Sequence, residues 1–140
     1  MQNAKVNKHE LVVKKWYESL DEGKILSTKC RRCGTYEYPP LYCCNNCSSS
    51  DVEWAEISGD GKLLEFTLPG AATSVQEYAH LMPYGVGVVE LKEGTNIIAV
   101  VCGISKENWQ EITSRLPIPV SAEIVQGQNN KSVVFRVTPE

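Results

Sequence analysis

Five cysteines fall within eighteen residues of this chain, in the segment CRRCGTYEYPPLYCCNNC. Cys30 and Cys33 form one CxxC pair, and Cys44 and Cys47 form a second pair after an interval of ten residues. Each pair can present two thiolates to one tetrahedral ion, with sulfur about 2.3 Å from zinc. The spacing therefore predicts a structural Zn²⁺ on these four cysteines. The metal would hold a module that is too small to bury a sufficient core alone.

Other uses of the same cysteines stay open. A different thiolate-bound metal or disulfide bonds would employ the same residues. Cys43 could replace Cys44 as a ligand, although its interval to Cys47 does not match that of the first pair.

The N-terminal sequence has no apolar signal core, and no run approaches the roughly 18 apolar residues that span a bilayer. We therefore expect a cytoplasmic protein without membrane association, in which thiols stay reduced and clustered cysteines indicate metal.

Beyond the cysteines, apolar residues recur with a period of two, which indicates β-strands. The predicted strands are residues 52–58, 62–68, 85–91, 96–102, 120–126 and 131–137. A short helical pattern at residues 105–116 lies before the last two. Five or six short strands with one inserted helix predict a small Greek-key barrel of the OB type. We expect a mainly β protein, with an N-terminal helix and zinc ribbon in residues 1–50 and an OB-fold in residues 51–140.

Residues 8–20 predict a helix of about three turns that ends near Gly23. Its apolar face includes Val13, Trp16, Tyr17 and Leu20. This face could pack on the chain's own core. A small metal module has little core to offer it, however, so docking on a partner protein is the alternative, and we predict these four residues as a partner interface.

The segments 23–67 and 83–103 resemble a known family that joins a rubredoxin-like zinc ribbon to a C-terminal OB-fold. Its members occur beside thiolases, thiolase-like synthases and hydratases that act on acyl-CoA. The resemblance rests on the CxxCG…PP…CxxC ribbon and on the hairpin VELKEG. The matching positions are Cys30, Cys33, Gly34, Pro39, Pro40, Cys44, Cys47 and Val89 to Gly94.

This resemblance implies a non-catalytic subunit of a thiolase-type complex that helps to bind a coenzyme A thioester and supports a thiolase-like catalytic partner. A β-oxoacyl-CoA substrate is implied in the same way, with benzoylsuccinyl-CoA as one option. Recognition of the cofactor needs cations for phosphate and an apolar wall for the pantetheine arm. The candidate CoA-binding residues are Lys29, Arg31, Arg32, His80 and Tyr84. The three cations could instead form a solvated charge run.

The residues argue against chemistry in this chain itself. Thiolytic acyl transfer needs a nucleophilic cysteine, a general base and an oxyanion hole. Outside the four predicted ligands, the thiols are Cys43 and Cys102, and the histidines are His9 and His80. His9 precedes the predicted helix and Cys102 ends a predicted core strand, so no nucleophile and base come together. We expect no catalytic residues.

Nucleic-acid binding is the main alternative function, because zinc ribbons and OB-folds also occur in nucleic-acid-binding proteins. Such a protein needs a basic groove with exposed aromatic side chains for base stacking. The formal net charge of this chain is −3, and its predicted strands offer Trp54, Phe66 and Phe135 as aromatic side chains. Nucleic acid is therefore the less favoured ligand. A pure assembly scaffold without ligand contact is a third alternative.

Overall fold

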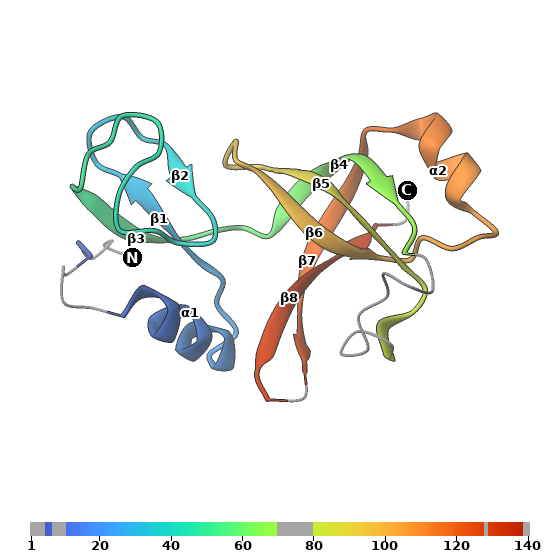
Figure 1. The fold of residues 1–140 in the computed structure, drawn as a ribbon, viewed down its shortest axis with the longest axis horizontal. Helices are drawn as coiled ribbons and strands as arrows, with labels where there is room; N and C mark the ends of the chain where they lie inside the picture. The colour runs from blue at the N-terminus through green and yellow to red at the C-terminus, as the bar shows by residue number, and fades with distance from the viewer. Residues whose placement is uncertain (1–4, 7–10, 70–79, 128, 139–140) are drawn as a thin grey trace. The chain divides into compact units, whose positions relative to one another are not determined.

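A computed structural model describes residues 5–6, 11–69, 80–127 and 129–138 of the chain. The chain divides into two compact units. The first comprises Met1–Ser58 with Glu93–Thr95, and the second comprises Gly59–Lys92 with Asn96–Glu140. Strands dominate both units, and Figure 1 shows their order along the chain. The predicted mainly β fold, with an N-terminal helix, a cysteine ribbon and an OB-type barrel, is confirmed.

The first unit holds one helix and a three-stranded antiparallel sheet in the order β2-β1-β3. Its elements are α1 (Val12–Asp21), β1 (Leu26–Cys30), β2 (Tyr36–Glu37) and β3 (Val52–Glu56). The segment 52–58, which the sequence pattern groups with the barrel strands, pairs as β3 with β1 from Leu26↔Glu56 to Cys30↔Val52. The cysteines are therefore tied to a sheet at Cys30, the last residue of β1.

Helix α1 ends where the sequence predicts, at a glycine. Gly23 has φ 78°, in the left-handed region that favours glycine. Its N–H donates to the Leu20 carbonyl at 3.0 Å, and the Lys24 N–H donates to the Ser19 carbonyl at 2.9 Å. These two bonds form a Schellman motif, which satisfies carbonyls at the end of the helix. The helix then packs on a small core formed by Val6, Val12, Leu26, Val52 and Trp54, with Trp16 packed against it.

The second unit is a closed five-stranded barrel in the order β4-β5-β6-β8-β7, completed by pairing of β4 with β7. Its elements are β4 (Asp60–Thr67), β5 (Tyr84–Leu91), β6 (Asn96–Cys102), α2 (Trp109–Arg115), β7 (Ile118–Gln126) and β8 (Lys131–Val137). All pairs are antiparallel except β6 with β8. The helix lies between the third and fourth barrel strands, as in the OB-fold that the sequence predicts. The barrel has five strands, the lower of the two predicted numbers.

Alternation along the barrel strands separates two apolar layers. Leu63, Val89 and Val101 are each 0% exposed. Cys102 is the neighbour of Val101 in β6 and belongs to a second cluster with Tyr84 and Val134. Because successive residues of a strand point to opposite faces, both sides of β6 carry apolar side chains at this point.

Neither helix of the described residues is long and apolar enough to cross a membrane.

The β4–β5 pair depends on a glycine at a close approach of two backbones. The register of β4 shifts between Leu63 and Glu65, which marks a bulge. A Cβ added at Gly87 would collide with the Glu65 carbonyl oxygen and would lie 2.9 Å from Leu63 Cδ1. Glycine at this position therefore lets the bulged strand lie against β5.

We expect Gly87→Ala to lower the free energy of unfolding by about 1–3 kcal/mol, the range typical of overpacking. Urea unfolding of the zinc-loaded chain measures the change. Glu90→Ala, an exposed position of the same strand, is the control and should change stability by about 0.5 kcal/mol or less. Equal losses for the two variants would contradict this role of Gly87.

Candidate metal centre

Two short turns of matching geometry carry the four predicted ligands. In the first turn, the Gly34 N–H donates to the Cys30 carbonyl at 2.9 Å, and the Cys30 N–H donates to the Thr35 carbonyl at 2.8 Å. In the second turn, the Ser48 N–H donates to the Cys44 carbonyl at 2.9 Å, and the Cys44 N–H donates to the Ser49 carbonyl at 2.9 Å. The same pair of backbone bonds thus repeats, offset by fourteen residues.

Both turns require a residue with positive φ directly after the second cysteine. Gly34 has φ 80° and Ser48 has φ 64°. Glycine adopts this conformation without strain, whereas serine incurs a conformational penalty. The sequence therefore reveals the first turn through Gly34 but gives no such signal at Ser48.

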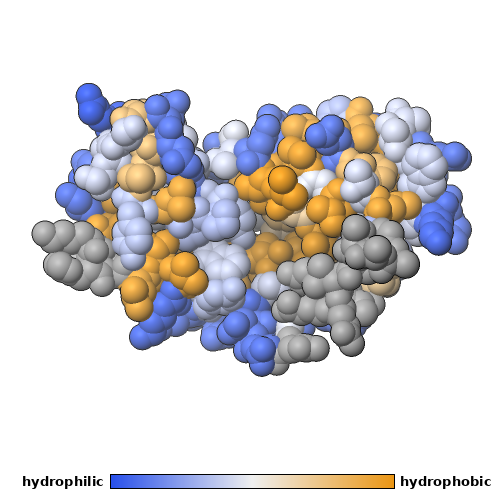
Figure 2. Space-filling model, viewed as in Figure 1, coloured by the Kyte–Doolittle hydropathy of each residue, from blue (hydrophilic) through white to orange (hydrophobic). Residues whose placement is uncertain are grey.

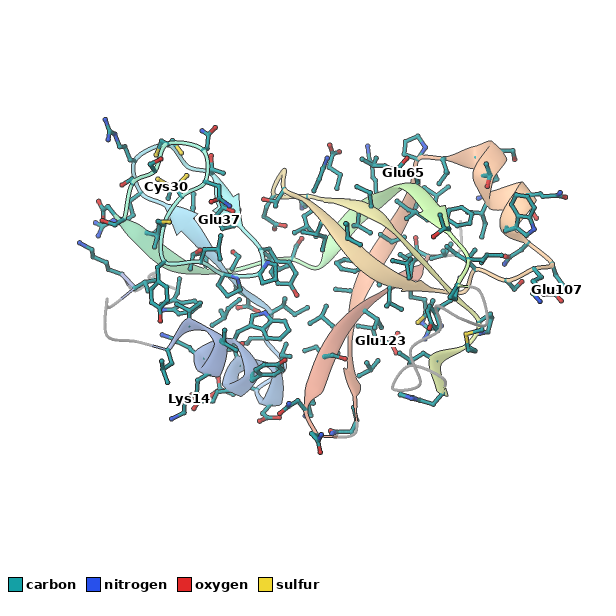
Figure 3. The ribbon with its side chains drawn as sticks, in the orientation of Figure 1. Lys14, Cys30, Glu37, Glu65, Glu107 and Glu123 are labelled. Atoms are coloured by element: carbon teal, nitrogen blue, oxygen red, sulfur yellow. The ribbon has the colours of Figure 1, made fainter. Side chains whose placement is uncertain are left out.

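The two turns bring the four sulfurs of Cys30, Cys33, Cys44 and Cys47 within 4.8 Å of one another. The Sγ atoms of Cys30 and Cys47 are 3.5 Å apart, as are those of Cys33 and Cys44. A tetrahedral Zn²⁺ with bonds of about 2.3 Å needs sulfurs about 3.8 Å apart. The four cysteines therefore fit a zinc ion as a complete ligand set, and Figure 3 shows the sulfurs gathered beside Cys30. Such an ion cross-links the two turns and leaves no open position for substrate.

Hydrogen bonds favour the thiolate that a metal requires. The hydroxyl of Thr35, then its backbone, and then the Asn46 amide lower the pKa of Cys33 to about 5. The pKa of Cys30 is also lowered, chiefly by the backbone N–H of Cys33. The Ser49 backbone lowers the pKa of Cys47, but burial and the neighbouring sulfurs of the cluster raise it to about 12. Metal ligands must be deprotonated, so two ligands are prepared for a cation and Cys47 releases its proton when the cation binds.

The two remaining thiols lie away from this cluster. Cys43 is exposed, whereas its neighbour Cys44 is 1% exposed and turned into the cluster. Cys102 is 1% exposed, and burial raises its pKa, which keeps it as a neutral thiol. Within the described residues, neither thiol is hydrogen-bonded to a base. His80 is exposed, and His9 lies outside the described residues.

The three candidate phosphate-binding cations lie beside the first turn, in different surroundings. Arg31 is 3.7 Å from Asp51 and 3.9 Å from Glu53, so its charge is already partly compensated. The Lys29 ammonium lies 5.3 Å from the centre of the Tyr36 ring. Arg32 is exposed. The other two candidates, His80 and Tyr84, belong to the second unit, and Tyr84 is 2% exposed in an apolar cluster. A ligand cannot reach a side chain buried in this way.

The residues predicted as a partner interface divide into two groups. Val13 is 67% exposed and Tyr17 is 37% exposed. Leu20 is 1% exposed, and Trp16 packs against the core of the first unit. The centroids of the Trp16 and Tyr38 rings are 6.3 Å apart, and burial raises the pKa of the Tyr38 hydroxyl to about 12. Leu20 therefore serves the chain's own fold, Trp16 is half-buried against that core, and Val13 and Tyr17 are exposed.

Several polar residues that support the second turn were not predicted from the sequence. Glu37 accepts the Asn45 backbone N–H at 2.9 Å and the Asn45 side-chain amide at 3.3 Å. Thr28 is 0% exposed; its hydroxyl donates to the Leu41 carbonyl at 3.0 Å and accepts the Leu41 N–H at 3.1 Å. These contacts join β2 to the second turn at Asn45, and β1 to the segment that leads into this turn at Leu41. Polar residues in a loop give no spacing signal from which such contacts could be found.

A two-turn, four-cysteine site on a three-stranded sheet, followed by a closed OB barrel, defines a zinc-ribbon/OB-fold protein. Two domain models match the chain in the same order. Residues 18–53 match the ChsH2 rubredoxin-like zinc ribbon domain, and residues 54–118 match the ChsH2 C-terminal OB-fold domain. The chain belongs to this ChsH2-type zinc-ribbon/OB-fold family.

Relatives carry names of two kinds. A protein of Thermomonospora curvata named "Probable enoyl-CoA hydratase alpha subunit" is 30% identical over an alignment of 115 positions that covers 75% of this chain and 35% of that protein. The chain thus spans about a third of the length of this relative. A "DUF35 domain-containing scaffold protein" of Methanocaldococcus jannaschii is 24% identical over 100 residues, 71% of this chain and 70% of that protein.

Two solved structures share the fold. A chain of the structure named "Ltp2-ChsH2(DUF35) aldolase" has 25% identity and a TM-score of 0.70, over 94% of this chain and 96% of that chain. A DUF35-family protein of unknown function from Sulfolobus solfataricus has 16% identity and a TM-score of 0.57, over 91% and 85% of the two chains. The second match shows the fold alone.

We expect Cys44→Ser to lose the metal and to destabilise the first unit, because the site then lacks a ligand whose side chain is buried in the cluster. Cys43→Ser is the matched control and should keep about one zinc per chain. Metal analysis of the purified variants measures the difference. The reverse result would mean that Cys43, and not Cys44, binds the metal.

Proposed function

We propose that this chain is a non-catalytic, zinc-containing subunit of a thiolase-type acyltransferase complex that acts on a β-oxoacyl-CoA. In this role the chain docks on a thiolase-like catalytic partner, supports it, and helps to bind the coenzyme A thioester. The proposal includes a cytoplasmic location, which rests on the use of cysteine as a metal ligand.

An exposed apolar surface on the first unit carries the proposal. Figure 2 shows apolar surface over α1. The exposed large apolar side chains of α1 and its flank are Leu11 (66%), Val13 (67%) and Tyr17 (37%), and those of the nearby loop are Leu41 (39%) and Tyr42 (47%). The Tyr42 hydroxyl accepts the Val12 N–H at 3.4 Å, which ties this loop to the helix. We call these five residues the α1 patch.

The α1 patch has the composition of a docking surface. Aromatic and aliphatic residues form the buried centres of protein interfaces, whereas charged residues are depleted there. The nearby charges of Lys14 and Glu18 are 3.8 Å apart and lie in an i,i+4 pair, so they form a neutral rim. A zinc-held module is rigid enough to present such a surface without reordering on association.

The names of the relatives support a role as a subunit. One relative is named as a probable enoyl-CoA hydratase alpha subunit, another as a scaffold protein, and a structural neighbour is named as an aldolase. The thiols agree with this role. Four cysteines gather at the metal site, Cys102 is buried, and Cys43 is exposed without a hydrogen bond to a base, so the described residues offer no activated thiol.

For the cofactor, we propose Lys29 and Arg32 as the cations that meet phosphate. Both border the first turn, and the acidic partners of Arg31 make that third cation the weaker candidate. Lys29→Ala with Arg32→Ala should then raise the apparent KM of the assembled complex for its CoA substrate. A fall in kcat at unchanged KM would point to assembly instead.

Co-purification tests the proposed function. A tagged chain expressed in its native cell should retain a thiolase-like protein, and thiolytic cleavage of β-oxoacyl-CoA should require both chains. Turnover by the isolated chain would overturn the proposal. Retention of nucleic acid, with micromolar binding of single-stranded oligonucleotide that weakens steeply with salt, would favour the nucleic-acid alternative.

We expect Val13→Lys to weaken association with the partner about tenfold or more, because burying a valine contributes about 1.5 kcal/mol or more and a lysine at this position must also be desolvated. Ile98→Lys, at a 79% exposed position of the barrel, is the matched control and should leave association unchanged. Titration calorimetry measures affinity, and thermal unfolding should be equal for both variants. Loss of binding by Ile98→Lys alone would place the interface on the barrel.

A further inference from the structure

The four cysteines of the metal centre differ in their access to solvent. Cys30 and Cys44 are each 1% exposed, Cys47 is half-buried, and Cys33 is exposed. Zinc leaves a closed four-thiolate site when a proton or an alkylating agent reaches one of the sulfurs, or when a chelator reaches the metal as a sulfur moves away. Access alone therefore makes Cys33 the sulfur at which the site would open first.

The hydrogen-bond donors around the sulfurs also differ between the buried and the exposed cysteines. The buried Cys30 sulfur accepts the backbone N–H groups of Arg32 and Cys33, both at 3.4 Å. The buried Cys44 sulfur accepts the Asn46 N–H at 3.3 Å. These donors belong to the turns themselves. The sulfur of the exposed residue Cys33 likewise has a hydrogen bond from its own turn, through the Thr35 backbone, and it is approached by two side chains as well.

Thr35 and Asn46 are these two side chains. Thr35 Oγ1 lies 3.2 Å from Cys33 Sγ, and Asn46 Nδ2 lies 3.7 Å from the same sulfur. A metal-bound thiolate carries no proton and can only accept, so both groups act as donors to it. Hydrogen bonds to an ionised acceptor are roughly twice as strong as those between neutral groups.

Asn46 also connects the two turns. Its backbone N–H donates to Cys44 in its own turn, while its side chain donates to Cys33, thirteen residues earlier. The preceding residue, Asn45, has the same side chain and a different partner, because its amide donates to Glu37. The chain thus provides two adjacent asparagines, of which one contacts a ligand sulfur and the other does not.

We propose that Asn46, together with Thr35, is a positioning residue of the metal centre that shields the exposed Cys33 thiolate and sets the rate at which zinc leaves through it. The side-chain donors hold the Cys33 sulfur in place and offset its negative charge at the side open to solvent. Residues of this kind next to a metal ligand typically change metal affinity by 10–100-fold when they are replaced.

Zinc release to a chromophoric chelator tests this proposal on the zinc-loaded chain. Asn46→Ala should release zinc about tenfold faster than the parent chain. Asn45→Ala removes the side-chain bond to Glu37 but keeps the backbone bond and removes no donor to sulfur, so it should accelerate release much less. Asn46→Asp should be faster than Asn46→Ala, because a carboxylate would face the thiolate. Thr35→Val removes only the hydroxyl at similar volume and should accelerate release as well.

Two further readouts separate shielding from general loosening of the fold. In the Co²⁺-substituted chain, Asn46→Ala should move the sulfur-to-metal charge-transfer band to longer wavelength, since the thiolate loses a donor, while Asn45→Ala should not. Iodoacetamide labelling followed by peptide mapping should modify Cys33 first among the four ligands, and faster in Asn46→Ala. Equal release rates for Asn45→Ala and Asn46→Ala, or first modification at Cys47, would overturn the proposal.

Discussion

Convergence of four thiolates on one cation is the interaction on which the first unit depends. The two CxxC turns repeat the same backbone bonds, and the first turn begins at Cys30, the last residue of β1. The apolar cluster beneath the sheet is small, with five buried residues and Trp16 packed against it. Such a core contributes little against the conformational entropy of the surrounding loops. Zinc binding therefore supplies much of the folding free energy of this unit.

The second unit is stabilised by different means. Its barrel closes through β4 and β7, and its strands bury side chains such as Leu63, Val89 and Val101 completely. Close approach of β4 and β5 at Gly87 completes the packing. Among the described residues of this unit, no group of cysteine, histidine or carboxylate side chains could hold a metal ion. Each unit has its own source of stability, and the four cysteines of the metal site serve a structural role in the first unit.

Much of this structure could be predicted because its signals are local. The spacing of the cysteines predicts the four ligands, Gly34 and Gly23 predict residues with positive φ, and the period of two predicts the barrel strands. Alternation identifies residues 52–58 as a strand but not its partner, which is β1 and not a barrel strand. In the second turn, the residue with positive φ is Ser48 and not a glycine, so the sequence does not show that this turn has the same geometry.

The surface of the first unit was harder to predict. Helical spacing places Val13, Trp16, Tyr17 and Leu20 on one broad stripe, yet only part of that stripe is buried. Burial depends on which elements pack against the helix. The spacing of apolar residues in the sequence does not show which elements these are. The contact of Asn46 with Cys33 was missed for a similar reason, since it joins two turns through a side chain that has no characteristic spacing.

Hydrogen exchange of the chain with and without zinc tests most directly whether the metal holds the first unit. In the zinc-loaded chain, the amides of β1 and β3 should be protected, as should those of β4 to β8. Removal of zinc should abolish protection in β1 and β3 and leave the barrel strands protected. Protection of β1 and β3 that survives complete removal of zinc would contradict the account.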